Sequence, residues 1–331
     1  MDRRGFLGIG GAALVSIGTQ WATADPALAA AANGDTITPA TVDRMSERVE
    51  ALRAMEQEAG GGDFIDSARA DLRLITRMLD NGRYTQRTGR RLYSLAAEVC
   101  CLLGWMSYDA SFNTAAQKYY TAALRAAKTA ADDTLGAHTL CFMATQAATN
   151  EEQRAAVGLM QAAESVRSQV PRIMQASLAA HQTTVFVKAG EKRSAAQALS
   201  RAFAALERAT NDDAPAYLRW FGEAQLRSTE GRFLLLTGQA DRATDALERS
   251  VTHAAPRDQA VRCGTLALAY QQAGDLDGAL DATDRALGLI DTGIHTQRGV
   301  ERLQEVRKGF NPHQSEPRVK EASERIAAMA A

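Results

Sequence analysis

One pattern recurs five times along this chain of 331 residues: a small residue closes a helical segment, a short turn follows, and an alanine anchors the next helical segment. The separations between the anchoring alanines are 40, 39, 48 and 36 residues, and the five are Ala116, Ala156, Ala195, Ala243 and Ala279. Small residues let two helices approach closely while larger side chains fill the space beside them. The pattern therefore predicts a solenoid, in which each helix pair contacts only its neighbours.

The residues within each unit resemble tetratricopeptide repeats. The first unit combines Gly104-Trp105, Ala116 and Tyr120, and the fifth contains Ala-Gly-Asp-Leu-Asp-Gly-Ala-Leu at residues 273–280. The separations exceed the roughly 34 residues of the simplest such unit, which indicates extended helices or connections. We predict an all-α fold: a right-handed superhelical tetratricopeptide-like solenoid of about five helix pairs with N- and C-terminal capping helices.

Helix start and stop signals divide the chain further. Thr38-Pro39 begins a helix that ends at Gly60, and a second helix ends at Asn81-Gly82, with proline in the first turn and glycine beyond the end. The predicted segments are a twin-arginine-like signal or flexible linker remnant at 1–35, N-terminal capping helices at 36–82, tetratricopeptide-like repeats at 83–293, and C-terminal capping helices at 294–331.

Composition narrows the function. The formal net charge is −1 and the pI is about 6.5, so no overall field would attract nucleic acid, and we expect no direct nucleic-acid binding. The apolar run at residues 9–17 is shorter than the roughly 20 residues of a membrane span, and we expect no such span.

Four cysteines lie in alanine-rich helical stretches without a CxxC pair; they are Cys100, Cys101, Cys141 and Cys263. This pattern predicts buried, reduced thiols and favours a reducing compartment.

The N-terminus points to a different compartment. Arg3-Arg4-Gly5-Phe6-Leu7 followed by an apolar segment resembles a twin-arginine export signal, although Asp2 and Gly8 depart from the usual residues. The stretch at residues 8–13 also satisfies G-x-G-x-x-A, but no strand precedes it, so it predicts no dinucleotide site.

The chain also resembles a family. From Gly82-Arg83-Tyr84 through Gly104-Trp105 and Tyr120 to Trp220-Phe221-Gly222-Glu223-Ala224 and Arg325, it is similar to the C-terminal tetratricopeptide sensor domain of actinobacterial helix-turn-helix (XRE-type) transcriptional regulators, here without the DNA-binding domain. The resemblance implies a cytoplasmic regulator, in which the first residues are the remnant of a linker. We expect a cytoplasmic location, with export through the twin-arginine pathway as the alternative.

In tetratricopeptide arrays the first helix of each pair lines the concave face. Mapped onto this chain, the resemblance predicts that the face carries Glu98, Trp105, Tyr108, His138, Thr184, Trp220, Gln225, Arg232 and Gln271. Trp105, Tyr108 and Trp220 are the leading candidates, because large rigid aromatic side chains dominate contact energy where they are accessible. Packing between repeats is the alternative role for these three.

Motifs for catalysis are lacking in the sequence. Five histidines are spread over separate units without HExxH spacing, and there is no G-x-S-x-G, P-loop or catalytic cysteine signature; the histidines are His138, His181, His253, His295 and His313. The paired carboxylates Asp132-Asp133 and Asp212-Asp213 precede helices and are interpreted as caps. We therefore predict a protein that is not an enzyme and has no metal or cofactor.

Three functions remain open. The first is a non-catalytic regulatory or scaffold protein that binds a peptide or protein in the concave face. The second is an exported protein-interaction scaffold, and the third, less favoured, is an enzyme built on a helical solenoid. Homodimerisation through the terminal helices is also possible, since an end repeat leaves an apolar face to cover.

Overall fold

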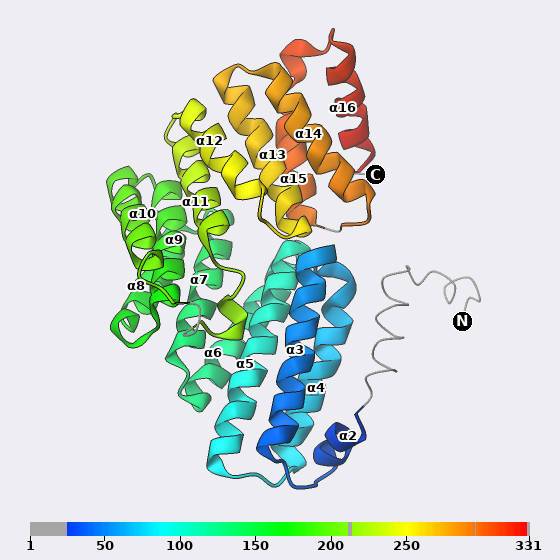
Figure 1. Cartoon of the computed structure of the whole chain (residues 1–331), viewed down its shortest axis with the longest axis vertical. Coiled ribbons are helices and arrows are strands. Elements are labelled where there is room, and N and C mark those ends of the chain that lie inside the picture. The colour runs from blue at the N-terminus through cyan, green and yellow to red at the C-terminus, as the bar shows by residue number, and fades with distance from the viewer. Residues whose placement is uncertain (1–24, 211–213, 295, 330–331) are drawn as a thin grey trace, which may run out of the picture.

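The computed structural model describes residues 25–210, 214–294 and 296–329, and within these ranges the chain forms fifteen α-helices and no β-strand (Figure 1). After the short α2 (Pro26–Ala32), two long helices, α3 (Pro39–Ala59) and α4 (Ile65–Asn81), precede five helix pairs. The pairs are α5 (Gln86–Asp109) with α6 (Asn113–Ala130), α7 (Asp133–Thr149) with α8 (Gln153–Glu164), α9 (Arg172–Lys188) with α10 (Lys192–Leu206), α11 (Glu223–Leu236) with α12 (Ala240–Val251), and α13 (Pro256–Ala273) with α14 (Leu276–Asp291). Two further helices follow, α15 (Gln297–Gly309) and α16 (Pro317–Ala328). The predicted all-α stack of helix pairs is confirmed.

The turn inside each pair explains the repeated alanine. Each turn holds one residue in the left-handed region, with φ between 62° and 81°: Ser111, Glu151, Gly190, Gly238 and Gly274. The anchoring alanine follows this residue at a constant offset of five positions and is fully buried in all five pairs. The same backbone turn therefore places the same small side chain against the first helix each time, even where Ser111 and Glu151 replace the glycine that left-handed backbone favours.

Close helix contact within a pair depends on glycine. A Cβ atom added to Gly104 of α5 would lie 2.4 Å from the ring of Tyr120 on α6, and one added to Gly231 of α11 would lie 2.4 Å from Leu247 on α12. Both distances are far shorter than a normal carbon contact. The large buried side chain on the second helix therefore occupies the space that a side chain on the first helix would need.

Two smaller features, a helix cap and the state of the cysteines, also agree with the sequence. The Asp132 side chain accepts a hydrogen bond from the Leu135 N–H at 2.9 Å and caps α7, as predicted. All four cysteines are buried and free, and burial raises the pKa of the Cys100 and Cys101 thiols to about 12. Among the helices of the described ranges, none combines the length and apolarity that crossing a bilayer requires.

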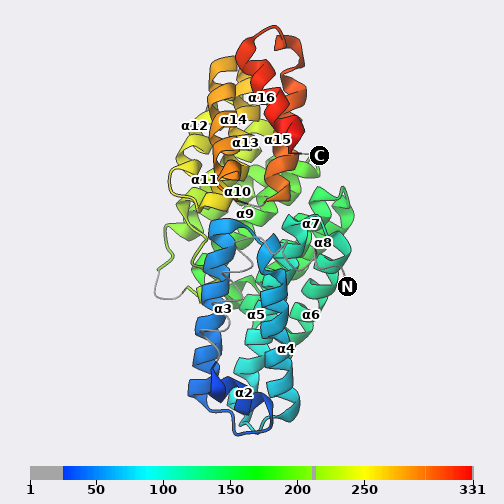
Figure 2. The ribbon, with the colours of Figure 1, turned by 90° about the vertical axis from the view of Figure 1, so that its right-hand side faces the viewer.

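The array of helices bends until its two ends meet. The C-terminal ends of α3 and α5 lie against the N-terminal ends of α13 and α15, which Figures 1 and 2 show from two directions. Arg257 of α13 forms an ion pair with Glu56 of α3 at 3.0 Å, and Arg298 of α15 forms one with Asp109 of α5 at 2.5 Å. The solenoid is thus closed into a helical ring, a contact between residues about 190 to 200 positions apart that the sequence did not predict.

Candidate ligand-binding cavity

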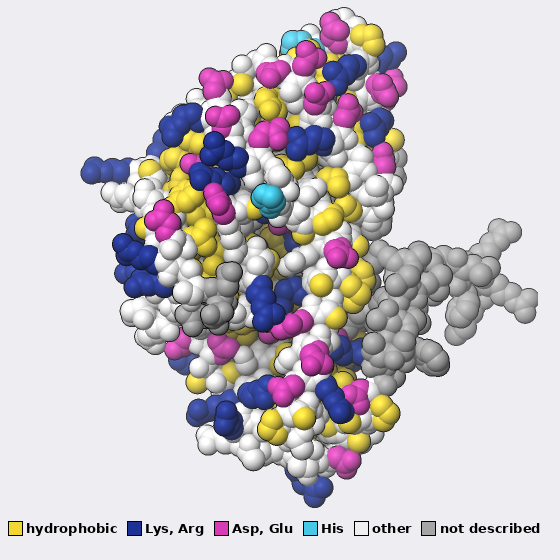
Figure 3. All heavy atoms as spheres, in the orientation of Figure 1, with side chains coloured by type: hydrophobic (Ala, Val, Ile, Leu, Met, Phe, Trp, Pro, Cys, Tyr) yellow, Lys and Arg dark blue, Asp and Glu magenta, His cyan; other side chains and the backbone are white. Residues whose placement is uncertain are grey.

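The helical ring surrounds a partly enclosed central cavity of about 560 Å³. The first helix of each of the five pairs contributes to its lining, together with α3, α15 and the segment Tyr217–Phe221 that precedes α11. Figure 3 shows the surface hollowed in the middle of the molecule, with acidic and basic side chains around the hollow. A volume in this range is typical of sites for small molecules.

The structure brings together eight of the nine residues that the sequence analysis placed on the concave face. Those lining the central cavity are Glu98, Trp105, Tyr108, His138, Thr184, Trp220, Gln225 and Arg232. Gln271 lies elsewhere, because α15 covers the C-terminal half of α13 and the Gln271 amide donates to the Val306 carbonyl at 2.9 Å. A binding role for these residues stays a prediction.

An aromatic wall forms one side of the cavity. The Phe142 ring is its centre, with ring centroids of His138 at 4.4 Å, Trp105 at 4.7 Å and Trp220 at 6.2 Å. Trp220 is oriented by its indole N–H, which donates to the Tyr217 carbonyl at 2.9 Å. These rings come from α5, α7 and the segment before α11, so they pack between repeats and face the cavity at the same time.

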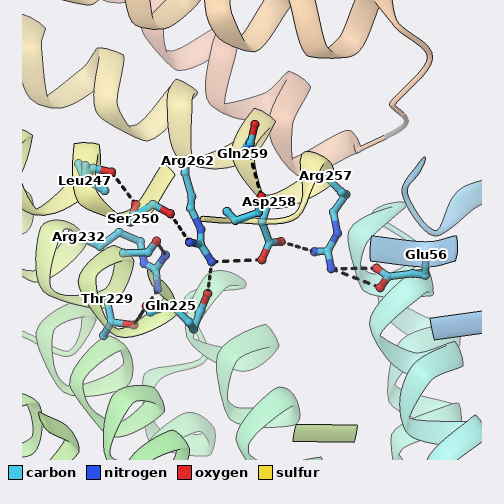
Figure 4. A network of polar contacts seen from close by, with 12 residues as sticks. Glu56, Gln225, Thr229, Arg232, Leu247, Ser250, Arg257, Asp258, Gln259 and Arg262 are labelled. Carbon is cyan, nitrogen blue, oxygen red and sulfur yellow. Dashed lines mark hydrogen bonds and ion pairs between the residues drawn. The ribbon is translucent and has the colours of Figure 1, made fainter. Parts of the chain in front are cut away.

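A chain of buried charges also lines the cavity (Figure 4). From the Glu56–Arg257 pair it continues through Asp258, which lies 3.0 Å from Arg257 and 3.2 Å from Arg262. Arg262 then donates to the Gln225 side-chain oxygen at 2.7 Å and to the Ser250 carbonyl at 2.6 Å. The network links α3, α13, α12 and α11. Its charged residues therefore hold the two ends of the helical ring together and also line the cavity.

A second group of charges lies beside Trp105. The Arg298 guanidinium is stacked 4.4 Å from the Trp105 ring centroid while it pairs with Asp109, whose carboxylate is 3 % exposed. Thr296 also donates to Asp109, at 3.2 Å. Stacking of this kind is favourable because the guanidinium faces the negative surface of the indole. Arg53 of α3 pairs with Glu98 of α5, the helix that also carries Trp105.

The sequence analysis missed most of these charged residues. It assigned α3 and α15 to caps, and so it overlooked Arg53, Glu56, Arg298 and their neighbours. On α13 the predicted face residue was Gln271, whereas the residues that line the cavity include Arg257, Asp258 and Arg262. Sequence spacing contained one usable signal, since Asp258 and Arg262 are four residues apart, the separation that pairs opposite charges on one helix face.

Two histidines in the cavity wall are uncharged at neutral pH. Burial lowers the pKa of His138 to about 3, with smaller contributions from His181 and Arg53. Burial and the neighbouring Arg232 lower the pKa of His181 to about 4. His181 Nδ1 shares a hydrogen bond of 2.8 Å with the Thr145 hydroxyl, whereas His138 Nδ1 has no hydrogen-bond partner among the described residues.

These shifts predict that acid destabilises the protein. Below pH 6.5, the ordinary pKa of histidine, each of these two histidines binds a proton in the unfolded chain but stays neutral in the folded protein. The free energy of unfolding is therefore highest above pH 6.5 and declines as the pH falls toward the pKa values of the folded protein. For His138 alone the loss between pH 7.5 and pH 5 is about 2 kcal/mol. We therefore expect the free energy of unfolding, measured by urea titration, to fall between these two pH values by about 2 kcal/mol less in His138→Leu than in the wild-type protein.

The control for that measurement is His253→Leu, because His253 is exposed and lies away from the cavity lining. We expect it to leave the dependence of stability on pH close to that of the wild-type protein. Equal pH dependence in His138→Leu and wild type would contradict a neutral His138 in the folded state.

Some predicted features lie outside the described residues. These are the twin-arginine-like stretch with its G-x-G-x-x-A sequence, the Asp212-Asp213 pair and His295. Within the part of the chain that the structure describes, no group of three or more His, Cys, Asp or Glu side chains is arranged to hold a metal ion.

Comparison with known proteins adds little to this geometry. No family model matches the chain. No curated protein matches it either. Among solved structures, BtubC (BKLC) from P. vanneervenii is 16% identical with a TM-score of 0.46, over 70% of this chain and 92% of that one. A putative kinesin light chain from Podosopora anserina with nearly identical TPR-like repeats is 15% identical with a TM-score of 0.42, over 59% of this chain and 94% of that one. The Cut9–Hcn1 hetero-tetramer of the APC/C is 13% identical with a TM-score of 0.42, over 86% of this chain and 59% of that one. The fold assignment therefore rests on the helix pairs themselves.

Proposed function

We propose that this protein is a non-catalytic binding protein whose central cavity holds a compact ligand, either a small molecule or a short segment of a peptide or protein partner. The observation that carries the proposal is the cavity of about 560 Å³, to which the first helix of all five pairs contributes. Pre-formed cavities of this size, mainly apolar with a few convergent polar groups, are typical ligand sites. Closure of the helical ring favours a compact ligand over a long extended peptide.

The proposed site is suited to regulation. Arg257 lines the cavity and also holds the two ends of the array together through Glu56. A ligand that contacts Arg257 or its partner Asp258 would therefore bind with different affinity to the closed and the open helical ring. That differential affinity is the requirement for a ligand to shift a conformational equilibrium.

Filling the cavity tests the proposal. Thr184 lines the cavity about one turn before the end of α9, and Thr184→Trp should occupy much of the space without adding a charge. The matched control is Thr121→Trp on α6, since both threonines donate to the carbonyl one turn earlier but Thr121 is exposed outside the lining. A thermal-shift screen of small molecules and short peptides would be run on all three proteins.

A ligand present at about 100 times its Kd should stabilise the wild-type protein and Thr121→Trp by about 2.7 kcal/mol and leave Thr184→Trp unchanged. If every stabilising compound acted equally on Thr184→Trp, the cavity would not be the binding site.

Other parts of the sequence analysis stay predictions. They are the regulatory role implied by the resemblance to XRE-type regulators, the cytoplasmic location with twin-arginine export as the alternative, and homodimerisation. The protein or peptide partner also stays a prediction, and it would reach the cavity only through a short segment.

A further inference from the structure

The central cavity is lined by more cations than carboxylates. Among the described residues, seven lining side chains are cationic and five are carboxylates: Arg53, Lys188, Arg232, Arg257, Arg262, Arg298 and Arg302 against Glu56, Glu98, Asp258, Glu301 and Glu305. Ion pairs account for five of the cations, namely Arg53–Glu98, Arg257–Glu56, Arg262–Asp258, Arg298–Asp109 and Arg302–Glu305. Glu301 is exposed and accepts a hydrogen bond from Ser111 at 2.8 Å. The two cations left over are Arg232 and Lys188.

Among the described residues, Arg232 is bound by hydroxyl groups alone. Its Nη1 donates to Ser228 Oγ at 2.8 Å and its Nη2 to Thr229 Oγ1 at 3.2 Å, both from the preceding turn of α11. No described carboxylate lies within ion-pair distance of this half-buried guanidinium, although Asp258 contributes some stabilisation from farther away. Burial and the nearby Arg262, Arg302 and Arg298 lower its pKa to about 10.

Lys188 is the second lining cation without an ion pair among the described residues, and it is exposed. Its Nζ donates to Thr149 Oγ1 at 3.2 Å and approaches the Ala148 carbonyl at 3.5 Å. Burial lowers the pKa of Lys188, and Arg302 and Arg232 lower it further, against the opposite effect of Glu305 and Glu151. Lys188 of α9 and Arg232 of α11 thus both line the cavity without an ion-pair partner among the described residues.

We propose that the cavity binds a small organic anion, with its carboxylate, phosphate or sulfonate group on Arg232 and Lys188 and a planar apolar group against the wall of Trp105, Phe142 and Trp220. This inference rests on the proposed function, since it names the ligand class of the same cavity. A guanidinium fork matches an oxyanion with two parallel hydrogen bonds, and an ammonium adds a compact charge beside it. Aromatic faces supply the apolar contact that a planar ligand needs.

A pair of fluorescent probes tests the anionic group. Anilinonaphthalene sulfonate has a planar aromatic system and one sulfonate, and N-phenylnaphthylamine has the same rings without the charge. Binding of each would be followed by energy transfer from tryptophan in the wild-type protein, in Arg232→Gln, in Arg232→Lys and in Arg193→Gln. Arg193 is an exposed arginine of the outer helix α10, so its variant controls for the loss of one charge.

We expect saturable binding of the sulfonate at one site per chain, with the uncharged probe about tenfold weaker. Arg232→Gln should weaken the sulfonate about tenfold and leave the uncharged probe unchanged, Arg232→Lys should weaken it less, and Arg193→Gln should not change it. Glutamine at position 232 keeps a donor for Ser228 and Thr229, and circular dichroism would verify that each variant is folded.

The outcomes separate this inference from the proposed function. If both probes bind equally and Arg232→Gln weakens neither, the proposal of an anionic ligand is overturned, whereas the proposal that the cavity binds a ligand stands. Absence of saturable binding by either probe would overturn both. Competition with benzoate and with phenyl phosphate completes the test: displacement by either supports the proposal and tells carboxylate from phosphate, and failure of both to displace the sulfonate contradicts it.

Discussion

Replacing Arg257 by leucine is expected to lower the free energy of unfolding by about 3–5 kcal/mol. The Arg257 side chain is 6 % exposed and the Glu56 carboxylate 2 % exposed, so the substitution leaves a buried carboxylate without its partner. Burial already raises the pKa of Glu56, and Arg257 is the main influence that opposes this rise. The measurement is a urea titration followed by circular dichroism at pH 7.5.

Two controls distinguish the loss of a partner from the loss of an arginine. In Glu56→Leu with Arg257→Leu, both charges are gone, and much of the stability should return because Asp258 keeps its pair with Arg262. Arg219→Leu removes an exposed pair with Glu50, whose side chains are 66 % and 44 % exposed, and it should cost less than about 1 kcal/mol. A double variant no more stable than Arg257→Leu alone would mean that the carboxylate is not the source of the instability.

The same substitution reports on the shape of the molecule. Arg257 contributes to the contact by which α13 meets α3, and the pair of Arg298 with Asp109 holds α15 against α5 nearby. Weakening one of the two links should increase the population in which the helical ring is open. Small-angle scattering of Arg257→Leu under native conditions should therefore give a larger radius of gyration than the double leucine variant.

The helix pairs were predictable because their causes are local. Each left-handed turn lies five residues before a buried alanine, so the repeat is visible in the sequence even where Glu151 replaces glycine. Start signals such as Thr38-Pro39 act within one turn, and the structure has Thr38 at the N-cap of α3 as expected. Eight of the nine proposed face residues line the cavity because a stripe on a helix follows from its periodicity.

Closure of the helical ring was not predictable in the same way. It depends on the small rotation between successive pairs, which accumulates over the five pairs before Glu56 can meet Arg257. Nothing within either segment identifies the other, since an arginine and a glutamate at the end of a helix are ordinary surface residues in most sequences. For the same reason Gln271 was assigned to the concave face, although α15 covers that part of α13.

Replacing Tyr120 by alanine is expected to lower the free energy of unfolding by about 3–5 kcal/mol, as for other large aromatic side chains removed from a core. Tyr120 is fully buried, and its ring fills the space that Gly104 leaves open between α5 and α6. It also lies 6.4 Å from the Phe142 ring, so a void here would loosen the aromatic wall of the cavity. Urea titration gives the loss of stability, and the change in tryptophan fluorescence reports on the wall, which contains Trp105 and Trp220.

Tyr120→Phe is the matched control, because it keeps the ring and removes only the hydroxyl. The Tyr120 oxygen is buried and has no hydrogen-bond partner among the described residues, so its removal should leave stability unchanged or raise it by up to about 1 kcal/mol. At one position, we therefore expect a large loss of stability from Tyr120→Ala and no loss from Tyr120→Phe. A substantial loss in Tyr120→Phe would show that the hydroxyl has a partner, whereas a small loss in Tyr120→Ala would show that α5 and α6 can move together over Gly104 to close the void.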